Sequence, residues 1–148
     1  MEKLHFEDYE IGEKFISSGR TITETDIVIY AALTGDWHQL HTNVEYAKTT
    51  MFKERIAHGM LTLVIGTALL GRLGEYVLLP KSFIAFYGMD KVRLTGPVKI
   101  GDTIHCEATV NEKRDKETAG IIGYTIEIKN QKEEIVASLV LKLFCGKR

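Results

Sequence analysis

The chain has 148 residues, 45% hydrophobic and 26% charged, with a net charge of −1. This length and composition are typical of one globular domain with a sizeable core, so we expect a single domain over residues 1–148. Nineteen basic residues are balanced by twenty acidic ones, which excludes the basic excess that nucleic-acid-binding proteins usually carry.

Membrane, secretory and disulfide-stabilised classes are also disfavoured. The longest nearly apolar run, residues 61–71, is far shorter than the ~20 residues of a membrane-spanning helix. The N-terminus has no apolar segment of a secretory signal. Cys106 and Cys145 lack the spacing of a zinc or redox motif, so we expect free thiols that fill the core of a cytoplasmic protein. The glycine fingerprints of dinucleotide and P-loop sites are absent, which favours chemistry or binding without a cofactor.

The chain is expected to begin with an extended segment around residues 14–22, followed by a helix. Thr23 is a candidate N-cap, and Glu24 and Asp26 place negative charge in the first helical turn, where the helix dipole favours it. Helical spacing of apolar residues continues up to Gly35. The apolar face of this helix is predicted to consist of Ile27, Tyr30, Ala31 and Leu33.

A polar loop over residues 35–42 and a short helix over 44–50, capped by Asn43, are predicted next. Residues 58–71 are apolar on nearly every helical face, which predicts a helix that is buried on all sides. Three glycines in this segment indicate close backbone contacts, because an interior glycine costs about 1 kcal/mol relative to alanine. They are Gly59, Gly66 and Gly71.

The second half of the chain is predicted to form β-strands. Apolar residues alternate with polar ones around Ile104, Cys106, Ala108 and Val110, the pattern of a strand with one buried face. The expected strands cover residues 82–95, 103–110, 121–128 and 135–144, and the intervening turns cover 97–102, 111–118 and 130–134. Short polar connections predict an antiparallel meander. We therefore expect an α+β fold in which an antiparallel sheet wraps around a central buried helix.

Two segments could carry chemistry. The predicted loop contains Asp36, His38 and His41, and the buried helix opens with His58 and Gly59. A helix N-terminus offers free N–H groups, so the Gly59 N–H could hold a developing oxyanion. Asp36 and His41 could position water and move protons. Together these groups predict acid–base chemistry beside a polarised carbonyl.

Each of these residues also has an ordinary structural explanation. Asp36 could be a turn residue and His41 a surface residue, while His58 could form a structural hydrogen bond near a helix start. The hydroxyls of Thr62 and Thr67 could bond back to their own helix. The histidine spacing fits no familiar zinc pattern, so we expect no metal. The G-x-S-x-G motif of serine hydrolases does not occur.

The two segments together resemble the signature of a known family. Thr34-Gly35-Asp36 leading to His41, followed by Phe52 and then Ile56-Ala57-His58-Gly59-Met60-Leu61, is similar to the motifs of the MaoC-like dehydratases, which include (R)-specific enoyl-CoA hydratases. The turn over residues 97–102, Pro-Val-Lys-Ile-Gly-Asp, resembles a turn common in their hot-dog fold. The resemblance covers roughly residues 9–144.

The resemblance implies a hot-dog fold and a hydro-lyase of fatty acid metabolism. Such enzymes add water to a trans-2-enoyl-CoA, giving a 3-hydroxyacyl-CoA, or run the reverse reaction. By position, Asp36 and His41 match the catalytic pair and Gly59 matches the oxyanion-hole glycine. Either Asp36 or His41 could serve as acid or base. The candidate substrate-binding residues are His38, Asn43, His58, Thr67, Arg93 and Lys99.

The chain departs from the family pattern between the catalytic pair. His38-Gln39 stands where the family usually has Asn-Pro, and Asn43 stands where an aspartate is common. Asn43 can still cap a helix, but loss of the proline loosens or redirects the loop. We hypothesise that His38 contacts an unusual acyl group such as a dicarboxylate or a branched acid; an unchanged acyl preference in His38→Asn would contradict this.

Two other functions remain open at this stage. The same fold hosts acyl-CoA thioesterases, and a non-catalytic acyl-CoA-binding subunit would use the same surface. The resemblance also implies a homodimer or higher homo-oligomer, with the acyl-CoA at the interface between two subunits. Lys91, Arg93 and Lys99 could meet the CoA phosphates, although solvated charges at strand ends are common.

Overall fold

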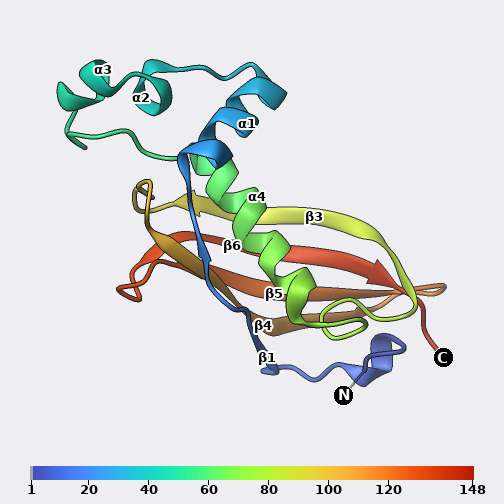
Figure 1. Cartoon of the computed structure of the whole chain (residues 1–148). Helices are drawn as coiled ribbons and strands as arrows, with labels where there is room; N and C mark the ends of the chain where they lie inside the picture. The colour runs from blue at the N-terminus through green and yellow to red at the C-terminus, as the bar shows by residue number, and fades with distance from the viewer. Residues whose placement is uncertain (1) are drawn as a thin grey trace.

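An antiparallel sheet curves around one long helix in the computed structural model, which describes residues 2–148 (Figure 1). The strands pair in the order β1-β4-β5-β6-β3, and β2 also pairs with β4. Their bounds are β1 Lys14–Ile16, β2 Arg20–Thr21, β3 Phe83–Leu94, β4 Thr103–Asp115, β5 Gly120–Lys129 and β6 Ile135–Cys145. The α+β prediction, with an antiparallel sheet wrapped around a helix, is therefore confirmed.

The expected meander is correct only for β4, β5 and β6. Strand β3 precedes β4 in the chain but pairs antiparallel with β6, from Phe83 opposite Cys145 to Leu94 opposite Ala137. The segment from Thr95 to Asp102 carries the chain across the end of the sheet, where the Thr95 N–H donates to the Val136 carbonyl. A two-residue turn would have forced β3 and β4 to be neighbours, whereas this longer connection does not.

The alternation in β4 correctly identifies the core. Ile104, Cys106, Ala108 and Val110 are all buried, and both cysteines are free thiols in the core. The strand continues to Asp115, where it pairs with Gly120, the first residue of β5. The turn predicted over 111–118 is therefore shorter than expected.

The central helix is α4, Gly59–Leu70. The prediction that it is buried on all sides is wrong, because Met60 and Val64 are 53% and 54% exposed. The sheet of one chain surrounds only part of the helix (Figure 1), so one helical stripe faces outward. A Cβ at Gly66 would collide with Ile128, as close packing predicts, whereas one at Gly71 would contact nothing.

Three helices project beyond one end of the sheet (Figure 1). They are α1 Glu24–Thr34, α2 Gln39–Thr42 and α3 Val44–Lys48, and we call residues 24–55 the helical overhang. Thr23 caps α1 in a reciprocal capping box with Asp26, as predicted. Gly35 ends α1 in the left-handed conformation (φ 79°), which glycine adopts without strain.

The overhang differs from the sequence expectation in three details. The predicted loop over 35–42 contains the single helical turn α2, whose N-cap is His38. Leu33, placed on the buried face of α1, is 82% exposed, because the end of α1 extends past the sheet. Asn43 caps α3 through its Oδ1 and the Tyr46 N–H, as expected, but α3 ends at Lys48.

Two 3-10 turns complete the described elements, η1 Phe6–Asp8 and η2 Gly71–Leu73. Among the helices of residues 2–148, none combines the length and apolar character needed to cross a membrane. A cytoplasmic location remains a prediction.

Candidate active site

His41 is held in α2 with one ring nitrogen engaged and the other free. Its Nδ1 donates to the Ile56 carbonyl oxygen over 2.7 Å. Because a carbonyl can only accept, Nδ1 carries the hydrogen and Nε2 carries a lone pair. Partial burial lowers the pKa of His41 below its usual value, and repulsion from His58 lowers it further. His41 is therefore a neutral imidazole with a free basic nitrogen.

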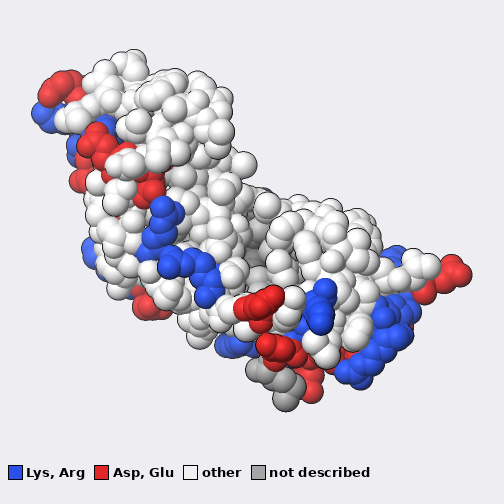
Figure 2. Space-filling view, turned by 45° about the vertical axis from the view of Figure 1, so that its right-hand side comes forward, with Lys and Arg blue, Asp and Glu red and all other residues white. Residues whose placement is uncertain are grey.

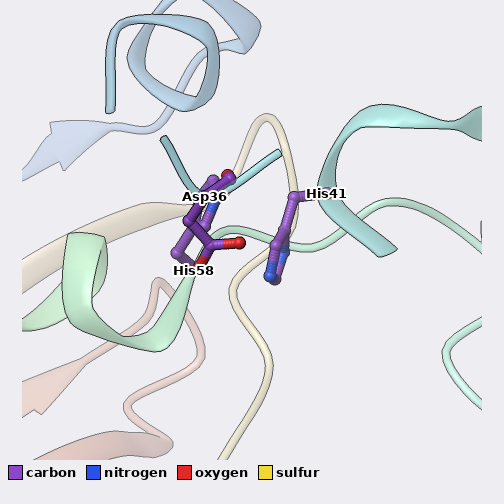
Figure 3. Close-up of side chains that lie close together, drawn as sticks. All are labelled: Asp36, His41 and His58. Carbon is purple, nitrogen blue, oxygen red and sulfur yellow. Dashed lines mark hydrogen bonds between the residues drawn. The ribbon is translucent and has the colours of Figure 1, made fainter. Parts of the chain in front are cut away.

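Asp36 and His58 lie beside His41 (Figure 3). One potential ligand atom from each of the three side chains lies within 4.8 Å of the others. Asp36 is exposed, and its Oδ1 accepts from the His38 N–H over 3.2 Å. The His58 ring is stacked on the His41 ring, with centroids 3.9 Å apart. The loop and the start of α4 thus bring together a carboxylate and a basic imidazole, as the sequence predicts.

Gly59 is the first residue of α4, and its N–H is available. The preceding N-cap residue, His58, makes no side-chain capping hydrogen bond, and the Gly59 N–H has no acceptor within residues 2–148. A cavity of about 400 Å³ is lined by both His41 and Gly59, together with Phe52, Thr62 and Leu94; we call it the site cavity. A Cβ at position 59 would meet the end of the Leu94 side chain, so a larger residue there would displace Leu94 within the site cavity.

A second cavity, the tail cavity, has a volume of about 420 Å³ and runs along the later turns of α4 towards β3. Its lining is almost wholly apolar and includes Val64, Ala68, Leu79, Phe86 and Leu141. Thr67 also lines it, but the Thr67 hydroxyl donates to the Leu63 carbonyl over 2.9 Å. The tail cavity can therefore hold a hydrocarbon chain.

The other predicted binding residues have local partners. His38 Nδ1 accepts from the Leu40 N–H as the cap of α2, and Asn43 donates to Gln39. Arg93 donates to the Val92 carbonyl, and Lys99 pairs with Glu54 at 3.5 Å. Their contact with a substrate stays a prediction.

The backbone carbonyl of Ile56 is a functional group that the sequence did not reveal, because it fixes the tautomer of His41 through a main-chain atom. Phe52 and Leu94 are further wall residues of the site cavity. Phe52 stood within the recognised motif, but no spacing pattern assigns it, or Leu94, to the cavity.

The cluster of Asp36, His41 and His58 also has the separation of a metal site. However, the two imidazole planes are only 29° apart and stacked, so their in-plane lone pairs point side by side rather than towards one ion. Tetrahedral zinc requires converging ligands. The expectation of a metal-free site remains a prediction that this geometry favours.

Comparison with known proteins identifies the family. The model of the family described as "MaoC like domain" matches residues 7–131. The chain belongs to the MaoC-like family. An (R)-specific enoyl-CoA hydratase of Rhodospirillum rubrum is 41% identical over 106 residues, covering 72% of this chain and 69% of the relative.

Solved structures agree with this family. The crystal structure of a monoamine oxidase regulatory protein from Archaeoglobus fulgidus is 42% identical, with a TM-score of 0.93 over 100% of this chain and 97% of that one. A Mycobacterium tuberculosis protein described as a double hot-dog fold matches with a TM-score of 0.80 at 15% identity, over 99% of this chain and 45% of that one. The hot-dog fold expected from the resemblance is thereby confirmed.

Proposed function

We propose that this protein is a hydro-lyase that adds water to a 2-enoyl-CoA, or removes it from a 3-hydroxyacyl-CoA. The observation that carries the proposal is the placement of His41: it lines one cavity with the unpartnered Gly59 N–H, and the Asp36 carboxylate lies beside it. The names of the Rhodospirillum rubrum hydratase and of a 35% identical 3-hydroxybutyryl-CoA dehydratase of Methylorubrum extorquens support this reaction class.

The Gly59 N–H would bind the thioester carbonyl oxygen. When water adds at Cβ, the electron pair of the double bond moves towards the carbonyl and negative charge develops on that oxygen. A preorganised donor at this position is worth several kcal/mol in related chemistry, ~3–4 kcal/mol for one oxyanion-hole donor. The positive end of the α4 dipole adds to the stabilisation.

His41 and Asp36 would activate and orient the water. His41 Nε2 accepts one proton of the water while the hydroxyl oxygen bonds to Cβ, and the Asp36 carboxylate accepts a hydrogen bond from the remaining O–H. The resulting imidazolium then returns the proton to Cα, so that H and OH have been added and His41 is neutral again. This sequence needs no redox cofactor or metal, because the thioester itself accepts the electrons.

The acyl chain would extend from the Gly59 N–H along α4 into the tail cavity. Leu63 and Thr67, which line that cavity, lie one and two helical turns beyond Gly59, a distance of about 6 and 12 Å at 1.5 Å per residue. An apolar cavity of about 420 Å³ is suited to a hydrocarbon rather than to a charged acyl group. Arg93 and Lys99 remain candidates for the CoA phosphates.

The direct test is to mix the purified protein with crotonyl-CoA and longer enoyl-CoAs and to follow the loss of enoyl absorbance. We expect hydration, detected as 3-hydroxyacyl-CoA by mass spectrometry. Release of free CoA thiol without hydration would instead indicate the thioesterase, and tight acyl-CoA binding without turnover on a broad panel would indicate the non-catalytic subunit. Either outcome would overturn the proposal.

We further propose that two copies of the chain pair along β3. This strand is at one end of the sheet order, and it carries large exposed apolar side chains outside the tail cavity, including Ile84 and Tyr87. An exposed apolar edge strand is an aggregation hazard unless it is covered. Met60 on the outward stripe of α4 is similarly uncovered. Figure 2 shows that few charged side chains lie in the hollow between the helical overhang and the sheet.

The occupant that fits this edge is a second copy of the same chain. The double hot-dog neighbour is more than twice as long as the region it shares with this chain, so the fold occurs there in pairs. Two β3 edges can pair with each other by two-fold symmetry, as isologous dimers require. We expect sedimentation to give a dimer, Ile84→Asp to give a monomer, and Ile11→Asp, at a similarly exposed site (58% and 61%), to leave the dimer intact. A wild-type monomer would contradict the pairing.

A further inference from the structure

His58 is the most deeply buried polar group near the catalytic pair, with 2% of its surface exposed. It lines neither the site cavity nor the tail cavity. As the N-cap residue of α4 it makes no capping hydrogen bond, so its burial serves neither substrate contact nor helix capping. Burying a polar ring is unfavourable unless its hydrogen bonds are satisfied, which makes its actual partners informative.

The first partner is the backbone of Asp36. His58 Nε2 lies 2.9 Å from the Asp36 carbonyl oxygen, and because the carbonyl accepts, Nε2 must carry the hydrogen. This bond connects residues 22 positions apart, and so ties the exposed catalytic loop to the start of α4. Asp36 itself is exposed, and its other hydrogen bonds, through its N–H and Oδ1, are to Thr34 and His38 of the same segment.

The second partner is the ring of His41. The two imidazoles stack at 3.9 Å with a 29° tilt, and Tyr30 packs on His58, with ring centroids 4.6 Å apart. His41 is thereby held between the Ile56 carbonyl at its edge and the His58 ring at its face. Side chains at a catalytic site keep a productive geometry only when neighbouring groups lock their rotamers.

The remaining nitrogen of His58 makes no contact of this kind. Nδ1 is buried and has no hydrogen-bond partner in the part of the chain that the structure describes. The ring is therefore held by the Asp36 carbonyl at one edge and by His41 and Tyr30 at its faces.

We propose that His58 is a positioning residue that sets the distance between Asp36 and His41 and aligns both with the Gly59 N–H. The proposal rests on the hydratase function proposed above and deepens it. His58 acts through other groups, because it is buried, its Nε2 is bonded to the Asp36 carbonyl and its ring is covered by His41 and Tyr30. This positioning role of His58 differs from the substrate-binding role expected from the sequence.

Two substitutions separate its two contacts. His58→Phe keeps a flat ring against His41 but removes the donor to Asp36, whereas His58→Gln keeps an N–H donor at nearly the Nε2 position but loses the stack. Misplacement of a catalytic group by about 1 Å can cost roughly 100-fold in rate. We expect His58→Phe to lower kcat about 100-fold with KM changed less than about threefold, and His58→Gln to recover at least about tenfold of that loss. His105→Gln, on the half-buried face of β4, is the matched control and should keep wild-type kcat.

A second readout does not depend on activity. The groups that face His41 from the neighbouring segments are Asp36, His38 and His58, and of these Asp36 raises its pKa while the two histidines lower it. We expect NMR titration of the His41 ring to show a higher pKa in both His58 variants than in the wild type, and no change in His105→Gln. If His58→Phe does not fold, this titration in His58→Gln carries the test.

The results that overturn the proposal are distinct from failure of the hydratase function. A wild-type kcat in His58→Phe, a raised KM with unchanged kcat, or an unchanged pKa of His41 in the variants would each refute positioning by His58. A wild-type protein without hydratase activity would refute the proposed function alone, and the titration would still decide whether His58 sets the environment of His41.

Discussion

The sheet body, which consists of the six strands and α4, and the helical overhang differ in how their side chains are packed. In the body, β4, β5 and β6 are joined by long antiparallel ladders, and their inner side chains, such as Ile126 and Ile128, are wholly buried. In the overhang, Leu33 and Met51 are 82% and 85% exposed. Yet the overhang, not the body, supplies Asp36 and His41.

This difference shows that the reactive groups are held by a few specific contacts rather than by a continuous core. The Ile56 carbonyl fixes the His41 ring, and the His58 ring fixes the Asp36 backbone. Arg55 also ties the end of the overhang to Glu24 over 2.9 Å. The body contributes the N-terminus of α4 and the tail cavity, whereas the site cavity has walls from both regions. Stability should therefore depend mainly on the body, and turnover mainly on the overhang.

Removing either catalytic side chain should have the largest effect. Asp36→Asn and His41→Gln should each lower kcat by roughly 10²–10⁴-fold, because each removes a group that holds or moves the proton of the attacking water. Since neither site is in the sheet core, the thermal unfolding midpoint should change little. Steady-state hydration of crotonyl-CoA measures the effect, and undiminished activity in both variants would refute the assigned mechanism.

A substitution in the sheet body should lower stability without lowering kcat. Ile126→Ala removes a fully buried side chain, which should lower the free energy of unfolding by about 2–5 kcal/mol through lost burial and the remaining cavity. The kcat of the folded enzyme should stay near that of the wild type. Chemical denaturation measures the stability, with the exposed Ile11→Ala as control; a large loss of kcat at full folding would show that the two regions are coupled.

Filling the tail cavity should alter specificity without abolishing turnover. Ala68 lines this cavity, so Ala68→Phe should obstruct a long acyl chain while leaving the thioester end of the site open. We expect kcat/KM to fall at least about tenfold for long-chain enoyl-CoAs and less than about threefold for crotonyl-CoA. Equal losses for both substrates would mean that the acyl chain lies elsewhere.

The smallest expected effect is a shift in the pH at which kcat/KM falls on the acid side. Burial lowers the pKa of His41 below 6.5, so kcat/KM should persist below the pH at which an ordinary histidine protonates, and fall only at lower pH. Protonation of His41 should also destabilise the native state. Just below pH 6.5 the unfolded chain binds more protons than the native state, so the free energy of unfolding falls as the pH falls. His41→Gln should reduce this acid sensitivity, measured as unfolding midpoint against pH.

Much of the fold could be predicted from local patterns. The alternation in β4, the Thr23 capping box and the Asn43 cap depend on neighbours within a few residues, and the structure confirms them. The pairing of β3 with β6 could not be predicted in this way, because a strand's partner depends on the path of the connection and not on its own alternation. The exposed stripe of α4 could not be predicted, because a helix that is apolar on every face has no polar residues to mark its solvent-exposed side.

The sequence by itself determined the family and the identity of the groups that could act. The spacing of Asp36, His41 and His58-Gly59 is part of the amino-acid sequence, so it can be read without knowing the fold. Only the tertiary structure decided how these groups are used. Which nitrogen of His41 is free, and how His58 is oriented towards its neighbours, depend on the Ile56 and Asp36 carbonyls. Those are main-chain atoms that every residue possesses, so only folding can select them as partners.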